Sequence, residues 1–202
     1  MSGTGAGATI ELVAPDVVHM LRRHLQQGRD GVLRALEGLS EYDVRRPMTP
    51  TGTNLLGLVK HLAGVELGYL GECVGRPRTP PPPWDEDGSV WECADMWAAA
   101  DESREEIVDL YREGWRHADA SIAELGLGAP ANVPWWPAER RGTTLGLVLV
   151  RVVAETAQHL GHAEILREAV DGQGGRDHDE LGDAEYWARY VARIQAAADR
   201  FR

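Results

Sequence analysis

Three side chains that could bind a metal ion lie close together in the stretch AETAQHLGHAEILREAVDG, residues 154–172. Glu155, His159 and His162 are spaced four and three residues apart, so on a helix they project from one side. The apolar residues that precede them on that side are Leu145, Val148 and Val152. A buried carboxylate is costly unless it is paired or bound to a metal. A metal ion would explain the carboxylate and the imidazoles together.

A third ligand can come from the stretch LLGLVKHLAGVE, residues 55–66. His61 has Leu58 three residues before it and Val65 four residues after it, which places it beside an apolar helical stripe. His61, Glu155 and His159 form a set of two histidines and one carboxylate, which binds zinc, nickel or iron(II) and leaves positions open. The sequence predicts a catalytic divalent metal site, with zinc as the first choice.

The role of His162 stays open between three interpretations. It could be a fourth ligand, a group beside the ligands that orients water, or a core histidine bonded to a backbone carbonyl. We favour the second and treat His162 as a candidate catalytic residue. The spacing of Glu155 and His159 is weak evidence alone, since such pairs also form ordinary surface contacts; the apolar alignment and His61 strengthen it.

Helices must position these residues, and apolar periodicity predicts four long ones. They cover about residues 16–39, 55–75, 101–125 and 144–171. Thr51 or Thr53 can cap the second helix, and Thr143 the fourth. The proline-rich stretch RPRTPPPPWDEDGSVWE, residues 76–92, is predicted to be an irregular crossover.

A further amphipathic helix is predicted near the C-terminus, in DAEYWARYVARIQAAADRFR, residues 183–202. We expect it to dock on the bundle or on a second subunit, which would make a homodimer. The predicted organisation is a flexible N-terminus at residues 1–15, a helical domain at 16–172, and a linker with the C-terminal helix at 173–202. No segment shows a comparably strong strand pattern.

The composition excludes some partners. The net charge is −11 and the isoelectric point about 5.1, so the protein would repel nucleic acid and anionic membranes. No apolar run approaches the roughly 18–20 residues that cross a membrane, and the N-terminal residues lack a secretory pattern. We expect a cytoplasmic protein with no membrane partner.

Two tryptophans and two cysteines are expected to have structural roles rather than to take part in chemistry. Trp135 and Trp136 lie just before the fourth helix and are expected to close the end of the core. Cys73 and Cys93 have acidic neighbours and no activating base nearby in sequence, so we expect unreactive thiols.

Taken together, TPTGTNLLGLVKHLAGVE, VPWW and ETAQHLGHAEILREAVDG resemble the DinB-like superfamily, specifically its actinobacterial branch of domains of unknown function, over about residues 16–172. The resemblance implies an all-α, up-up-down-down four-helix bundle with His61, Glu155 and His159 as metal ligands. Many members of the superfamily have histidine at the position of Glu155, whereas the mycothiol-dependent maleylpyruvate isomerases resemble this chain in having glutamate there. Many members also read H-R-G-Q where this chain reads H-L-G-H from His159, so the resemblance leaves His162 unassigned.

The superfamily includes thiol S-transferases and isomerases that use mycothiol, bacillithiol or glutathione. The resemblance therefore implies a metal-dependent thiol S-transferase or isomerase, whose partners are a small-molecule thiol such as mycothiol and an electrophilic substrate. Members without known activity exist, so a non-enzymatic metal-binding, stress-response module is the alternative. An iron(II) enzyme that activates oxygen is a third interpretation.

Overall fold

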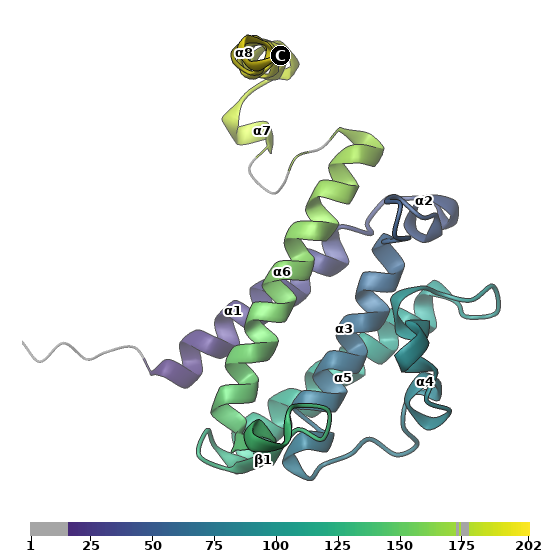
Figure 1. Cartoon of the computed structure of the whole chain (residues 1–202), viewed down its shortest axis with the longest axis vertical. Helices are drawn as coiled ribbons and strands as arrows, with labels where there is room; N and C mark the ends of the chain where they lie inside the picture. The colour runs from purple at the N-terminus through teal and green to yellow at the C-terminus, as the bar shows by residue number, and fades with distance from the viewer. Residues whose placement is uncertain (1–15, 173, 175–177) are drawn as a thin grey trace, which may run out of the picture.

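The protein is an all-α four-helix bundle, as the sequence predicts (Figure 1). The computed structural model describes residues 16–172, 174 and 178–202. The long helices are α1 (Val17–Arg34), α3 (Leu55–Tyr69), α5 (Arg104–Leu125) and α6 (Leu145–Asp171). Their buried leucine, valine and isoleucine side chains form the core of the bundle.

Helix α6 runs parallel to α1 and antiparallel to α3. Gly28 of α1 faces Thr156, and Gly31, one turn later, faces Leu160, so both helices advance in the same direction. The C-terminal end of α3 instead contacts Trp136, which precedes α6. Small residues in α1 allow this close approach, because a Cβ atom at Gly28 would lie 2.8 Å from Thr156.

The order of helix directions differs from the expected one. Helix α5 begins beside the C-terminal end of α1, where Arg104 donates a hydrogen bond to the carbonyl of Leu39 at 3.0 Å. Residues 70–103 return the chain along the bundle, so α3 and α5 run parallel (Figure 1). The order is up-down-down-up, because the chain has one long crossover, whereas up-up-down-down requires two.

Short elements fill the connections. Helix α2 (Glu41–Arg45) follows α1, and the crossover contains η1 (Glu72–Val74), α4 (Pro83–Glu86), η2 (Ser89–Glu92) and η3 (Ala94–Met96). The proline run thus ends in a helical turn, with proline at its first position. Before α6, β1 (Pro130–Asn132) pairs antiparallel with β2 (Gly142–Thr144), with η4 (Ala138–Arg140) between them. The sequence pattern did not predict this short sheet.

The helix caps differ from the predicted ones. Asn54, rather than Thr51 or Thr53, caps α3 by accepting a hydrogen bond from the Gly57 amide at 2.8 Å. Thr143 pairs in the sheet, so α6 begins after Thr144 without a side-chain cap. Helix α5 begins at Arg104 instead of Asp101, because Ser103 and Glu106 form a capping box.

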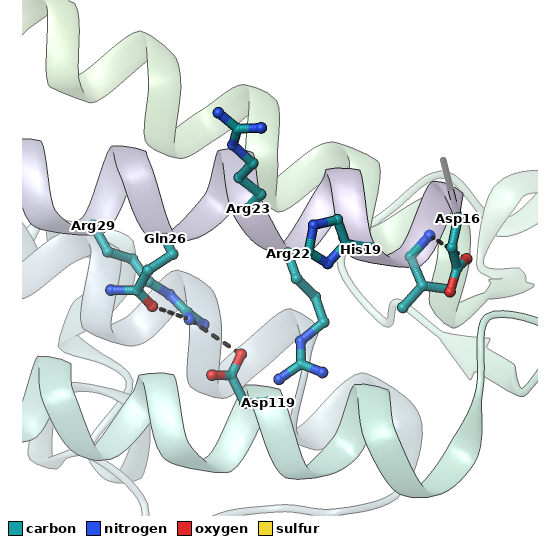
Figure 2. A pocket seen from close by; sticks show the side chains of 8 residues that line it. Asp16, His19, Arg22, Arg23, Gln26, Arg29 and Asp119 are labelled. Atoms are coloured by element: carbon teal, nitrogen blue, oxygen red, sulfur yellow. Dashed lines mark hydrogen bonds and ion pairs between the residues drawn. The ribbon is translucent and has the colours of Figure 1, made fainter. Parts of the chain in front are cut away.

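A buried ion pair joins α1 to α3. Arg29 donates to both carboxylate oxygens of Glu66, at 2.9 and 2.5 Å, and the two residues are 1% and 0% exposed. The guanidinium also donates to Gln26 and to Asp119 of α5, at 3.2 and 3.1 Å (Figure 2). Three helices are therefore tied together by one charged group.

The C-terminal segment lies apart from the bundle (Figure 1). It consists of α7 (His178–Leu181), α8 (Ala184–Ala198) and η5 (Asp199–Phe201), and none of the residues of α8 is buried. Docking on the chain's own bundle is therefore not observed. The predicted flexible N-terminus and part of the predicted linker lie outside the described residues. No helix that the structure describes has the length and apolar character needed to cross a membrane.

Candidate metal centre

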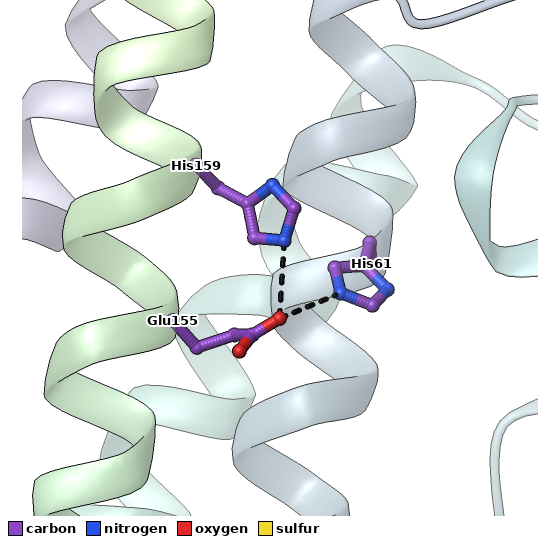
Figure 3. A group of neighbouring side chains, drawn as sticks. All are labelled: His61, Glu155 and His159. Atoms are coloured by element: carbon purple, nitrogen blue, oxygen red, sulfur yellow. Dashed lines mark hydrogen bonds and ion pairs between the residues drawn. The ribbon is translucent and has the colours of Figure 1, made fainter. Parts of the chain in front are cut away.

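His61, Glu155 and His159 meet in the space between α3 and α6 (Figure 3). One potential ligand atom from each lies within 4.8 Å of the others. The Glu155 Oε1 atom is 3.3 Å from His159 Nε2 and 3.8 Å from His61 Nε2. The antiparallel packing of the two helices thus brings the three predicted residues together.

The geometry of the three side chains fits a metal ion. Zinc takes imidazole nitrogen and carboxylate oxygen at about 2.0–2.2 Å, which puts tetrahedral ligand atoms roughly 3.4 Å apart. The two separations from Glu155 Oε1, 3.3 and 3.8 Å, are close to that value, and all three ligand atoms lie within 4.8 Å of one another. Two imidazoles with one carboxylate also form a donor set suited to zinc, nickel or iron(II).

A carboxylate that the sequence analysis missed orients His61. Asp95, in η3, accepts a hydrogen bond from His61 Nδ1 at 2.6 Å and is only 7% exposed. A carboxylate only accepts, so Nδ1 carries a hydrogen, and Nε2 is the ring nitrogen that faces Glu155. Metal-binding histidines commonly have such a partner. Asp95 is 34 residues from His61 in sequence, and no periodic pattern linked the two.

Residues of α3 hold the segment that carries Asp95. The Lys60 ammonium donates to the carbonyls of Ala94 and Trp97, at 2.8 and 3.0 Å, on either side of Asp95. Gly57 permits contact with the same segment, because a Cβ atom there would lie 1.8 Å from the Met96 carbonyl oxygen. His61 and the position of its partner are thus fixed by one helix.

Arg151 orients the other oxygen of Glu155. Its Nη2 atom lies 2.5 Å from Glu155 Oε2, one helical turn along α6. This ion pair leaves Oε1 directed toward the two imidazoles, as Figure 3 shows. The sequence analysis did not single out Arg151, although an arginine four residues before a glutamate is a recognisable helical pair.

His162 contacts the outer side of His159. The two Nδ1 atoms are 3.4 Å apart, so His162 meets the ring nitrogen of His159 that does not face Glu155. His162 itself is exposed to solvent. It is not among the three residues whose ligand atoms converge.

The pKa of His159 is lowered, chiefly because burial disfavours the imidazolium and also because His61 is close, so the neutral ligand form is favoured.

A cavity of about 370 Å³ opens beside two of the three side chains, His61 and Glu155. His61 and Glu155 line it, together with Trp84, Trp91 and Trp135. Positions on a metal that the protein leaves free would therefore face the cavity.

The two tryptophans before α6 have different surroundings. The indole N–H groups of Trp135 and Trp136 both donate to the Tyr69 hydroxyl, at 3.1 and 3.2 Å. Trp136 packs on the core, which fits its predicted structural role. Trp135 is 40% exposed and lines the cavity, so for this residue the prediction was incomplete.

The remaining candidates lie elsewhere. Cys73 is buried and its pKa is raised to about 12, chiefly by burial and also by Glu72, which fits an unreactive thiol. Cys93 is exposed and does not line the cavity.

Comparison with known proteins decides the family. The sequence matches the model for mycothiol-S-transferase over residues 20–172, which is most of the chain. The chain belongs to the mycothiol-S-transferase family. Within the DinB-like group, this family assignment confirms the resemblance noted from the sequence. No curated protein matches the sequence.

Solved structures support the fold of this mycothiol-S-transferase family member. A conserved protein from Enterococcus faecalis, known from a crystal structure, superimposes with a TM-score of 0.58. The match covers 79% of this chain and 100% of that chain, at 14% sequence identity. Identity this low supports a shared fold and nothing about activity.

Proposed function

We propose that the protein is a divalent-metal-dependent thiol S-transferase, with His61, Glu155 and His159 as ligands and a small thiol such as mycothiol as donor. The observation that carries the proposal is the convergence of three ligand atoms within 4.8 Å beside an open cavity, in a member of this family. Zinc is the metal we propose, because two imidazoles and one carboxylate leave a tetrahedral zinc one free position.

The protein's own residues would hold the metal ion, orient its ligands and line the cavity beside them. A divalent ion bound by the three ligands supplies positive charge that lowers the pKa of a thiol beside it. Asp95 and Arg151 hold His61 and Glu155 in orientation, and three tryptophans line the cavity beside them. In the transfer, the thiol releases its proton to solvent and a sulfur–carbon bond forms. The leaving group departs with the electron pair of its bond to carbon.

We assign His162 a positioning role in this reaction. When His159 binds through Nε2, its Nδ1 atom carries the hydrogen and can donate to His162 Nδ1, 3.4 Å away. His162 does not line the cavity, so the proposed role acts through the orientation of His159. This replaces the direct contact with water that the sequence suggested.

Metal content tests the ligand assignment. Protein purified without a histidine tag is expected to hold one divalent ion per chain by elemental analysis. Alanine at His61 or His159 should abolish stoichiometric metal, because each change removes one of three ligands. Alanine at His24, an exposed histidine of α1, is the matched control and should retain the metal. Full retention in both ligand variants would reject the assignment.

Turnover tests the reaction. Metal-loaded protein with mycothiol and a bromomethyl bimane should form the conjugate faster than metal-free protein does. Bacillithiol and glutathione serve as alternative donors. Failure of all three thiols, without any change in the spectrum of a cobalt-substituted site, would favour a non-enzymatic metal-binding module. The open cavity argues against that alternative, since a module without substrate needs no access to the site.

The identity of the bound metal distinguishes the proposed transferase from the third interpretation, an iron(II) enzyme that activates oxygen. Two histidines and a carboxylate also suit iron(II), and oxygen uptake by anaerobically iron-loaded protein would indicate an oxygen-activating enzyme. Nickel or zinc in the purified protein, with no oxygen uptake, would support the transferase.

A further inference from the structure

Arg151 is the only arginine or lysine among the described residues that line the cavity. It lies on α6, one turn before the proposed ligand Glu155, and its Nη2 atom is 2.5 Å from Glu155 Oε2. Its side chain is 48% exposed, whereas that of Glu155 is 14% exposed. Arg151 thus contacts a proposed metal ligand and also borders the space in which a substrate would lie.

Two carboxylates beside the metal position carry as much negative charge as a divalent ion carries positive charge. One is the proposed ligand Glu155, and the other is Asp95, which accepts a hydrogen bond of 2.6 Å from a ligand histidine. Glu72 and Asp85 line the same cavity and add negative charge. Without Arg151, a bound divalent ion would be fully offset by its surroundings, and a thiolate would gain little from approaching the site.

The ion pair of Arg151 uses the Glu155 oxygen that the metal position leaves free. Glu155 Oε1 lies 3.3 Å from His159 Nε2 and 3.8 Å from His61 Nε2, whereas Oε2 contacts the guanidinium. An ion held through Oε1 would leave the ion pair in place. The guanidinium then offsets the charge of Glu155, so the occupied site keeps a net positive charge.

We propose that Arg151 supplies the positive charge with which the metal centre selects a thiolate over an uncharged sulfur ligand. This inference rests on the proposed transferase function and names the form in which the sulfur donor binds. The cavity that Arg151 lines is the side from which the sulfur reaches the centre. The transfer itself is unchanged: the thiol releases its proton to solvent, the sulfur–carbon bond forms, and the leaving group departs with its electron pair.

Metal affinity distinguishes the charge of Arg151 from its effect on orientation. A residue that only orients Glu155 would weaken metal binding when it is removed. We expect Arg151→Met instead to strengthen metal binding about three- to tenfold, because the substitution removes a positive charge that repels the ion. A bound ion fixes Glu155 by itself, so the loss of orientation should cost less. Arg151→Lys keeps the charge and should bind metal as the unmodified protein does; chelator competition measures all three proteins.

Thiol affinity should change in the opposite direction. Calorimetric titration of the cobalt-substituted protein compares mycothiol with its S-methyl derivative, which has the same sugar and acyl groups but cannot form a thiolate. Arg151→Met should bind mycothiol about tenfold more weakly and the S-methyl derivative equally well, and Arg151→Lys should restore most of the affinity for mycothiol. Arg112→Met is the matched control, because Arg112 is 54% exposed, lies on α5 and does not line the cavity.

The outcomes separate this proposal from the proposed function. Weaker or unchanged metal binding in Arg151→Met would overturn the proposal. Unchanged mycothiol affinity, or an equal loss for mycothiol and the S-methyl derivative, would also overturn it. Binding of mycothiol that depends on the charge of Arg151, without turnover of any electrophile, would support the charge role and reject the transferase. Turnover with a mycothiol affinity independent of Arg151 would reject the charge role and support the transferase.

Discussion

At the scale of single residues, the Nδ1 atoms of His61 and His159, which face away from Glu155, contact different kinds of side chain. His61 Nδ1 donates to the buried carboxylate of Asp95 at 2.6 Å, whereas His159 Nδ1 lies 3.4 Å from the exposed His162. A short bond to a buried carboxylate fixes a ring more firmly than a long contact to an exposed imidazole. His61 therefore depends more strongly on its partner than His159 does.

This inequality predicts different losses of metal affinity. Asp95→Asn should weaken metal binding about 10- to 100-fold, the usual effect of removing such a partner, and His162→Gln should weaken it less. Competition with a chromophoric chelator measures both, with Glu92→Gln as the control. Equal affinity in Asp95→Asn and the unmodified protein would show that the carboxylate does not support the ligand.

Ligand chemistry also predicts a pH dependence. Histidines bind metal as neutral imidazoles, so affinity should be steady above the ordinary histidine pKa of about 6.5 and fall as protons compete below it. The lowered pKa of His159 delays its own protonation to lower pH. Chelator competition from pH 8 to pH 5 checks this, and constant affinity over that range would contradict histidine ligation.

At the scale of elements, the ion pair between Arg29 and Glu66 joins α1 to α3 inside the bundle. Both side chains are at most 1% exposed, and the arginine also reaches Asp119 of α5. Removing one partner leaves a charge buried without compensation, whereas removing both leaves an apolar contact. The pair fixes how three helices meet and so the distance between the elements that carry the site.

The expected stability changes follow from this asymmetry. Arg29→Met should lower the free energy of unfolding by about 3–5 kcal/mol, and the double change Arg29→Met with Glu66→Met should cost clearly less. Urea denaturation measures both. Arg112→Met, in the exposed pair with Asp109, is the control and should change stability by less than about 1 kcal/mol. A double change that costs as much as Arg29→Met alone, or more, would show that the buried charges are not coupled.

At the scale of the whole molecule, the described part of a single chain buries no residue of α8. Tyr190, Val191 and Ile194 are 42%, 60% and 54% exposed, and a helix of 15 residues is marginal in water by itself. Residues 184–202 hold four arginines and two acidic residues in a chain of net charge −11. A basic, apolar helix complements the acidic bundle of a second copy, where α6 exposes Leu147 and Ile165.

We therefore predict a homodimer in which α8 covers the partner's bundle. Sedimentation velocity should give a dimer at micromolar concentration. Ile194→Glu should shift it toward monomer, because a charge would enter the contact, whereas Ala192→Glu, on the opposite side of α8, should not. A monomer in the unmodified protein would contradict the prediction.

The sequence by itself determined the features that depend on local periodicity. Apolar spacing located the four long helices, and the spacing of Glu155 and His159 placed both side chains on one face of α6. The apolar stripe beside His61 placed it on a helix that could face them. These predictions succeed because residues three and four apart on a helix are neighbours whatever the rest of the chain does.

Only the tertiary structure decided the contacts between distant segments. The path of residues 70–103 set the helix directions, brought Asp95 to His61 and placed Glu72 and Asp85 in the lining of the cavity. Arg29 and Glu66 likewise lie 37 residues apart in sequence. Such pairs depend on how a long, irregular connection packs against the bundle. That packing is set by many weak contacts at once, and no short-range repeat in the sequence records it.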